Sequence, residues 1–119
     1  MNYLPEEDMK NTINFEDFNR VELRVGEILE AEKVPQTENL LRLTVDFGDL
    51  GKKKVITGIF RWYKPEELVG TQAVFVFNLA PKQIRGETSQ AMILTAEQPD
   101  GSYVIIVPQK RASPGARVY

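Results

Sequence analysis

The chain has 119 residues and a formal net charge of −2, and it contains neither cysteine nor histidine. These absences exclude disulfides, thiol nucleophiles and the usual zinc and haem ligands, and they leave an enzyme without histidine as a general base. A hydrophobic content of 42% is ordinary for one globular domain, and the apolar runs are too short for a signal region or a membrane span. The sequence therefore predicts a single soluble, cytoplasmic domain without a cofactor, a metal or a membrane partner.

The two signs of charge are separated along the sequence. Residues 1–32 carry three cations and nine acids, whereas residues 52–92 carry seven cations and three acids. Phosphate contacts need only a local positive patch, so the small negative total does not exclude RNA as a partner. The second of these segments is the candidate for such a patch.

The N-terminal part is predicted to contain an arm, a short helix and a first strand. Residues 1–13 are acidic and lack periodicity, which predicts a flexible arm. A short capped helix follows, in which Phe15 and Phe18 would share one face and plug the end of the core. Over residues 21–28 apolar and polar side chains alternate until Gly26 interrupts them, which indicates a strand with a bulge or a sharp coil.

Two further strands and a helix are predicted in the middle of the chain. A turn-rich loop at residues 34–39 precedes the cleanest alternation, which runs from Leu40 to Phe47. A hairpin turn then leads to a third strand at residues 53–59. Residues 63–70 form a short helix, because Pro65 suits its first position and a glycine ends it.

The remaining elements complete a small barrel. Residues 72–78 and 90–96 are predicted as the fourth and fifth strands. The expected fold class is all-β with one short helix, as a five-stranded, partly open Greek-key barrel of the OB-fold type over residues 14–119. An extra strand at residues 103–107 belongs to a C-terminal extension of about residues 97–119, which either caps the barrel or forms a subunit interface.

The segment from Asn78 to Met92 has an unusual content for a connection between two strands. Lys82 and Arg85 offer donors to phosphate, and residues 88–90 offer hydroxyl and amide groups. Gly86 can adopt a positive φ. A cationic, hydroxyl-rich loop on the rim of a barrel suits a nucleic-acid binder, although an inert solvated loop has the same composition.

The same segment resembles the signature of the tRNA-binding domain family. The matching elements are Asn78-Leu79, Pro81-Lys82, Arg85-Gly86, and Ser89 with Met92. Further similar stretches extend the resemblance from about Phe15 to Tyr119. The family includes small dimeric bacterial tRNA-binding proteins and the C-terminal domain of methionyl-tRNA synthetase, and one of its branches consists of export-associated, chaperone-like proteins.

The resemblance implies a non-catalytic module that recognises the shape and backbone of tRNA and acts as a homodimer through its C-terminal extension. It also implies an aminoacyl-tRNA synthetase as a candidate partner, and the family attributes tRNA binding to the positions that match Ser89 and Met92. The expected RNA-contact residues are Asn78, Lys82, Arg85, Ser89, Gln90 and Met92, with smaller contributions from Lys33 and Asn39.

Two alternatives belong to other functional classes. A protein-interaction module of the same fold would expose an apolar groove near Phe60, Trp62 and Tyr63, and its binding would not depend on salt. An enzyme is not expected, because the sequence pairs no Ser or Lys with a base at a readable spacing and has no phosphate-cradling glycine loop. The length, without a synthetase catalytic signature, favours a stand-alone chain.

Overall fold

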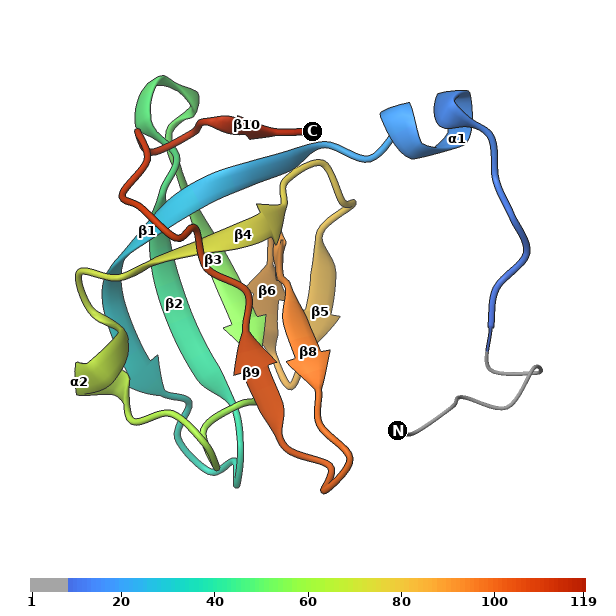
Figure 1. Ribbon diagram of the computed structural model, residues 1–119. Helices are drawn as coiled ribbons and strands as arrows, with labels where there is room; N and C mark the ends of the chain where they lie inside the picture. The colour runs from blue at the N-terminus through green and yellow to red at the C-terminus, as the bar shows by residue number, and fades with distance from the viewer. Residues whose placement is uncertain (1–8) are drawn as a thin grey trace.

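The strands of the computed structural model form one main sheet and two small hairpins, and the structure describes residues 9–119 (Figure 1). In chain order the elements are α1 (Phe15–Asn19), β1 (Leu23–Lys33), β2 (Leu41–Asp46), a 3₁₀ turn (Gly48–Leu50), β3 (Lys52–Thr57), α2 (Pro65–Leu68), β4 (Gln72–Val76), β5 (Lys82–Ile84), β6 (Glu87–Ser89), β7 (Met92–Ile93), β8 (Thr95–Glu97), β9 (Tyr103–Ile105) and β10 (Arg117–Val118). Most of the predicted N-terminal arm, residues 1–8, lies outside the described residues.

The main sheet is antiparallel throughout. Within the described part of the chain its antiparallel strands run β3-β2-β1-β4-β7, and β10 pairs with the start of β1. The sheet curls into a nearly closed barrel, and α2 lies between β3 and β4 in sequence (Figure 1). The all-β, OB-like fold class is therefore confirmed, and the described residues contain one short helix before the barrel, α1, and one within it, α2.

Alternation along the strands builds the core. In β2 the side chains of Leu41, Leu43 and Val45 are fully buried, and the residues between them are half-buried on the outer face. Beyond β2, the ring of Phe47 packs edge-on against Phe75 at 5.4 Å between ring centroids. Aromatic pairs of this geometry add to the burial of apolar area, so the interior of the barrel is aromatic at one end.

Gly26 allows β1 to cross directly over this core. A Cβ atom at Gly26 would lie 2.4 Å from Val45 Cγ1 and within 3 Å of two phenylalanine rings. The pairing of Gly26 with Ala73 of β4 is regular, and the register shift in β1 lies between Ile28 and Glu30 instead. The predicted special role of Gly26 is thus close packing, while the β-bulge falls a few residues later.

The barrel is closed by side chains as well as by strand pairing. Ser89 Oγ accepts a hydrogen bond from Ile56 N at 2.9 Å, and Gln90 Oε1 accepts one from Lys54 N at 2.8 Å. The backbone N–H of Gln90 also donates to the Lys54 carbonyl at 2.8 Å. We refer to these contacts between β3 and residues 89–90 as the seam.

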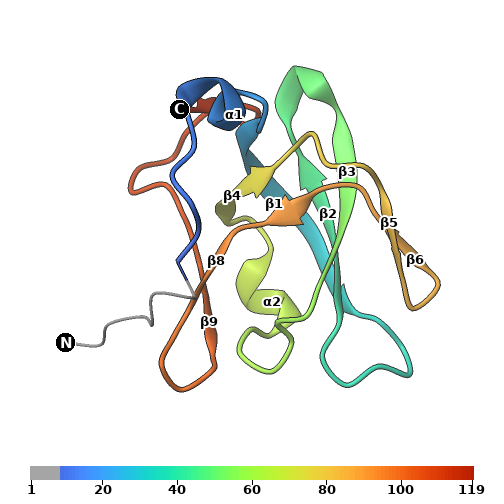
Figure 2. The same cartoon turned by 90° about the vertical axis from the view of Figure 1, so that its right-hand side faces the viewer.

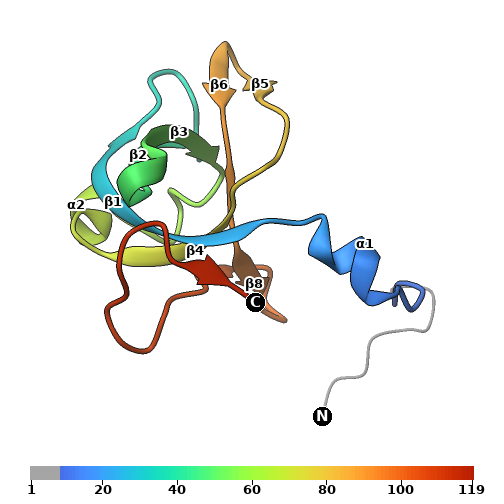
Figure 3. The same ribbon diagram turned by 90° about the horizontal axis from the view of Figure 1, so that it is seen from above.

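Helix α1 does not plug the core. Figures 1 and 3 show that it projects from the barrel, and Phe15 is 72% exposed while Phe18 is also exposed. Asn78 binds the backbone at Arg20 and Glu22, which fixes the chain at the edge of the sheet before β1 begins. The prediction for the two phenylalanines was wrong because the short connection leads α1 outward from that edge.

The C-terminal extension lies along its own barrel. The Gln72 side chain donates to Ala112 O at 2.6 Å and accepts from Ala112 N at 2.9 Å. Gly115 N donates to Val25 O at 2.7 Å, and β10 then adds to β1. The extra strand predicted at residues 103–107 is β9, which pairs with β8. Along residues 9–119 we find no helix with the length and apolar character needed to cross a membrane.

Candidate nucleic-acid interface

The surface that OB-folds use for ligands is the outer face of their second and third strands, with the loops that flank it. Here that face belongs to β2 and β3. The long connection after β4 contains the β5–β6 hairpin, which stands beside the barrel next to the loop at residues 34–40 (Figures 2 and 3). The segment from Asn78 to Met92 therefore lies on this face.

The β5–β6 hairpin has a tight two-residue turn. Arg85 and Gly86 have φ values of 50° and 82°, as the two central residues of a type I′ turn require. Such a turn matches the right-handed twist of the strands. It requires a positive φ at both central residues, so a glycine at the second position is favoured. Gln83 Nε2 donates to Thr88 Oγ1 at 2.7 Å across the hairpin. The turn consequently places the exposed side chain of Arg85 at the tip.

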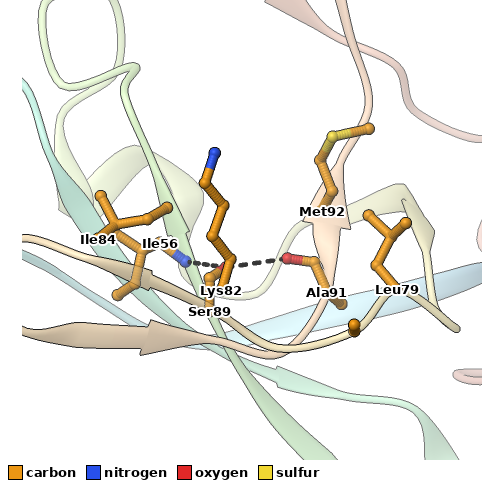
Figure 4. Close-up of a pocket in the computed structure, with 8 residues that line it drawn as sticks. Ile56, Leu79, Lys82, Ile84, Ser89, Ala91 and Met92 are labelled. Carbon is orange, nitrogen blue, oxygen red and sulfur yellow. Dashed lines mark hydrogen bonds between the residues drawn. The ribbon is translucent and has the colours of Figure 1, made fainter.

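An apolar hollow of about 160 Å³ lies where the hairpin meets β3 and β7. Its lining is Ile56, Leu79, Ala80, Lys82, Ile84, Ser89, Ala91 and Met92. Figure 4 shows Ile84 and Leu79 at opposite ends, with Lys82 and Met92 between them. Met92 is 47% exposed, so its thioether is available to a ligand. The hollow thus combines an apolar wall with one cation.

A second hollow of about 430 Å³ lies between the loop at residues 34–40 and the tip of the hairpin. Its lining is Gln36, Thr37, Glu38, Asn39, Leu40, Ile84 and Arg85. Ile84 contributes to both hollows, so they adjoin along the hairpin. Together they form a continuous surface with Lys82 in one part and Arg85 in the other.

A family model described as "Putative tRNA binding domain" matches residues 23–117, which is most of the chain. The chain belongs to the tRNA-binding domain family.

Relatives of this tRNA-binding domain include parts of much longer proteins. It is 44% identical over 110 residues to a methionine–tRNA ligase of Parabacteroides distasonis, a match covering 92% of this chain and 16% of the ligase. It is 47% identical over 106 residues to a methionine–tRNA ligase of Porphyromonas gingivalis, covering 89% of this chain and 15% of the ligase. The chain thus spans about one-sixth of the length of these ligases.

Two solved structures match along their whole length. A MetRS-related protein from Pyrococcus horikoshii is 36% identical with a TM-score of 0.86, covering 92% of this chain and 100% of that one. The chaperone CsaA from Bacillus anthracis is 35% identical with a TM-score of 0.84, at the same coverage of both chains. The tRNA-binding domain is therefore similar both to synthetase-related proteins and to a chaperone.

The structure brings together five of the eight predicted contact residues of the tRNA-binding domain. Lys82, Ser89 and Met92 line the first hollow, and Asn39 and Arg85 line the second. The other three, which line neither hollow, are Lys33, Asn78 and Gln90.

Several of these side chains have structural partners inside the domain. The amide of Asn78 accepts from Glu22 N at 2.9 Å and donates to Arg20 O at 2.8 Å. Asn39 likewise donates to Gly58 O and accepts from Arg61 N. Lys33 Nζ lies 5.4 Å from the centroid of the Phe60 ring, which is a long cation–π distance. Both asparagines therefore hold loops in place.

Ser89 is the most deeply placed of the predicted contacts. It is 7% exposed, and its hydroxyl donates to Ala91 O at 3.0 Å while it accepts from Ile56 N. Gln90 is exposed but uses its carbonyl oxygen in the seam. These two residues consequently connect the hairpin to β3, and Ser89 also lines the first hollow.

Lys82 and Arg85 differ from these residues. Both are exposed, and among residues 9–119 neither takes part in an ion pair. Other cations of the positive segment are engaged: Lys53 Nζ lies 3.7 Å from the Phe77 ring centroid, and Arg61 pairs with Glu38 at 3.7 Å. The hairpin therefore carries two free positive charges of this face, beside the exposed Lys52 and Lys54 of β3.

Sequence reasoning missed an ion-pair cluster on the outer face of β2. Arg42 Nε donates to Glu87 Oε1 at 2.7 Å and its terminal nitrogens reach Glu87 Oε2 and Glu32 Oε1. The hydrogen bonds to Glu87 and then Glu32 raise the pKa of Arg42 further, and the bond from Arg42 lowers the pKa of Glu87. The alternation in β2 predicts an outward Arg42, but it cannot identify a partner 45 residues away.

Proposed function

We propose that this domain binds tRNA without catalysing a reaction on it, through the β5–β6 hairpin and the two hollows beside it. The observation that supports this most is the pair of exposed cations on one hairpin, with Lys82 at the start of β5 and Arg85 in the turn. Neither is in an ion pair within the described residues, so both are available to phosphate.

The proposed contacts are of two kinds: cations of the protein bind phosphate, and apolar side chains pack against a base or ribose. Lys82 and Arg85 bind phosphate oxygens, while Met92 and Leu79 provide an exposed apolar surface for a base or ribose. Ser89, Gln90 and Asn78 contribute by fixing the backbone that carries these side chains. Recognition of this kind reads backbone geometry and shape, as RNA-binding modules do when the bases remain paired.

The comparisons support a role beside aminoacylation. The similar segments of methionine–tRNA ligases are domains of a synthetase, and the family itself is a binding domain. We propose that the domain presents tRNA to a synthetase, in the same chain or in a separate one, and has no active site of its own. Among the described residues, no three acidic, cysteine or histidine side chains cluster as metal ligands. We propose that this activity is cytoplasmic.

Titration of labelled bulk tRNA at two salt concentrations tests the proposal. Two phosphate contacts give an affinity that falls about tenfold between roughly 50 and 200 mM salt, because each contact releases a condensed counterion. Fluorescence anisotropy measures this change directly. Absence of binding at the lower salt concentration would refute the tRNA-binding function.

A protein partner is a second candidate function. The apolar hollow beside Met92 also fits an apolar side chain of an extended peptide, and one similar structure is a chaperone. The groove predicted near Phe60, Trp62 and Tyr63 supports this less, because Trp62 packs edge-on against Tyr103 at 5.4 Å. Binding of an apolar peptide that does not change with salt, together with no tRNA binding, would favour this candidate.

We also propose that two copies of the domain associate through exposed apolar residues of α1 and of the segment that follows β9. None of the five residues of α1 is buried, and the Phe15 side chain is largely exposed. After β9, Val107 is 57% exposed and the neighbouring Ile106 is also exposed. A two-fold contact would cover such a surface on both copies at once.

Replacing Phe15 and Val107 by serine is expected to convert the dimer to monomer at micromolar concentration. Each apolar side chain that becomes buried contributes about 1.5–3 kcal/mol, so the dimer dissociation constant should rise by at least about tenfold per substitution. Sedimentation equilibrium measures the change. Leu50→Ser, at an exposed leucine of the 3₁₀ turn, serves as the control. A monomeric wild-type chain would refute dimerisation.

A further inference from the structure

Arg42 lies in the middle of the proposed tRNA-binding face but its charge is already used. On the outer side of β2 its guanidinium forms a two-bond fork with Glu87, at 2.7 and 2.9 Å, and a third bond with Glu32 at 2.6 Å. Its side chain is 20% exposed. Lys54 of β3 adds a second cation near Glu87, where it helps to lower the pKa of that carboxyl. The bonds to Glu87 and Glu32 occupy all three nitrogens of the Arg42 guanidinium, so Arg42 is not free to bind an incoming phosphate in this arrangement.

The hairpin that carries Lys82 and Arg85 needs such an anchor. β5 and β6 have three residues each and form a separate two-stranded sheet. An isolated hairpin of this size is only marginally stable in water. Ser89 and Gln90 fasten its base to β3, but Glu87 lies at the other end, directly after the turn. The fork between Arg42 and Glu87 thus holds the end that bears Arg85.

The side chains beneath the hairpin also hold it against the barrel. Arg42 is opposite Ile56 in the pairing of β2 with β3, and Ile84 is opposite Glu87 in the hairpin. Ile56 and Ile84 both line the first hollow, so the hairpin covers the outer face of β3 at this point. The ion pair closes one side of this covered region, and the seam closes the other.

We propose that the Arg42–Glu87 ion pair is a latch that holds the β5–β6 hairpin against the barrel, and that Arg42 is a positioning residue for tRNA binding. This inference rests on the proposed function, because it concerns how Lys82 and Arg85 are presented to phosphate. Arg42 does not contact the RNA itself. A hairpin without the latch would have to be ordered on binding, which lowers affinity.

Two charge-matched variants separate the latch from a general electrostatic effect. Glu87→Gln and Glu32→Gln each remove one negative charge from a partner of Arg42, but only the first breaks the fork. In the free protein, we expect Glu87→Gln to lower the ¹⁵N order parameters of residues 84–88 from about 0.85 to below about 0.6. Glu32→Gln should leave these values unchanged, since Glu32 is 65% exposed and lies outside the hairpin. Arg42→Gln should behave like Glu87→Gln.

The binding measurement gives opposite results if Arg42 is part of a latch and if it is a phosphate ligand that Glu87 masks. If the ion pair is a latch, the Glu87→Gln variant binds tRNA about threefold to tenfold more weakly than the Glu32→Gln variant. Both variants lose one negative charge, but only Glu87→Gln has a mobile hairpin. Tighter or equal binding by Glu87→Gln would overturn the inference and make Arg42 a phosphate ligand that Glu87 masks. A rigid hairpin in Glu87→Gln would overturn it too. Failure of the wild-type protein to bind tRNA would refute the proposed function instead, since the relaxation data on free protein still test the latch.

Discussion

Replacing Lys82 and Arg85 together by alanine is expected to weaken tRNA binding by roughly thirtyfold to sixtyfold in ~0.1 M salt. Each cation that contacts a phosphate releases a counterion, which contributes about 0.7–0.9 logarithmic units of affinity per tenfold dilution of salt. Both side chains are exposed on the hairpin, so their removal leaves the core and the seam unchanged. The slope of affinity against salt should therefore decrease by about one for each cation removed.

The double variant Lys64→Ala, Lys110→Ala is the matched control for this experiment. It removes the same charge from the residue before α2 and from the C-terminal extension, away from both hollows. We expect its tRNA affinity to stay within about twofold of wild type, because charges more than a Debye length away are largely screened. Binding that survives loss of Lys82 and Arg85 would contradict the proposed site. It would direct attention to Lys52, Lys54 and Lys33.

The fold could be predicted from the sequence largely because its signals are local. The alternation from Leu40 to Phe47 corresponds to β2 within a residue at each end, and Pro65 begins α2 as expected. By contrast, the segment after β4 was predicted as a loop, although Arg85-Gly86 forms the turn of a hairpin. Strands of three residues are too short to show a periodicity, so only the glycine indicated this turn.

The candidate site was predictable where charge and exposure follow from the same local pattern. Lys82 and Arg85 belong to a polar segment, and the structure leaves both exposed. Ser89 and Asn78 have equally polar side chains, yet each binds backbone groups that lie 33 to 58 residues away in sequence. Long-range partners of this kind leave no mark in a single sequence, which is why direct contacts and structural hydrogen bonds could not be separated beforehand.

For the same reason, charge counting along the chain could not show which charges pair with one another. Residues 52–92 have an excess of cations, but Glu87 of this segment neutralises Arg42 of an earlier one. Phe15 and Phe18 show that local sequence cannot identify the partner of an apolar side chain either. Their spacing predicts a common face, but spacing cannot tell whether the face covers its own core or a second copy.

Ser89→Ala is expected to lower the free energy of unfolding by about 1–3 kcal/mol. The hydroxyl is buried, and its loss leaves the Ile56 N–H without its acceptor and the Ala91 carbonyl without its donor. A buried polar group without a partner loses its interaction with water and gains nothing in return. Urea denaturation measures the change, and the m-value should stay constant because the same surface is exposed on unfolding.

Met92→Ala is the partner experiment, because Met92 lines the same hollow from an exposed position. We expect its unfolding free energy to change by less than about 1 kcal/mol, as for surface substitutions, while tRNA binding weakens. Ser89→Ala should show the reverse. Its free energy of unfolding should fall, and its affinity for tRNA should fall only to the extent that the seam loosens. Unchanged stability with a large loss of affinity in Ser89→Ala would instead mean that the hydroxyl contacts RNA directly. The two variants therefore distinguish the residue that shapes the hollow from the residue that meets the ligand.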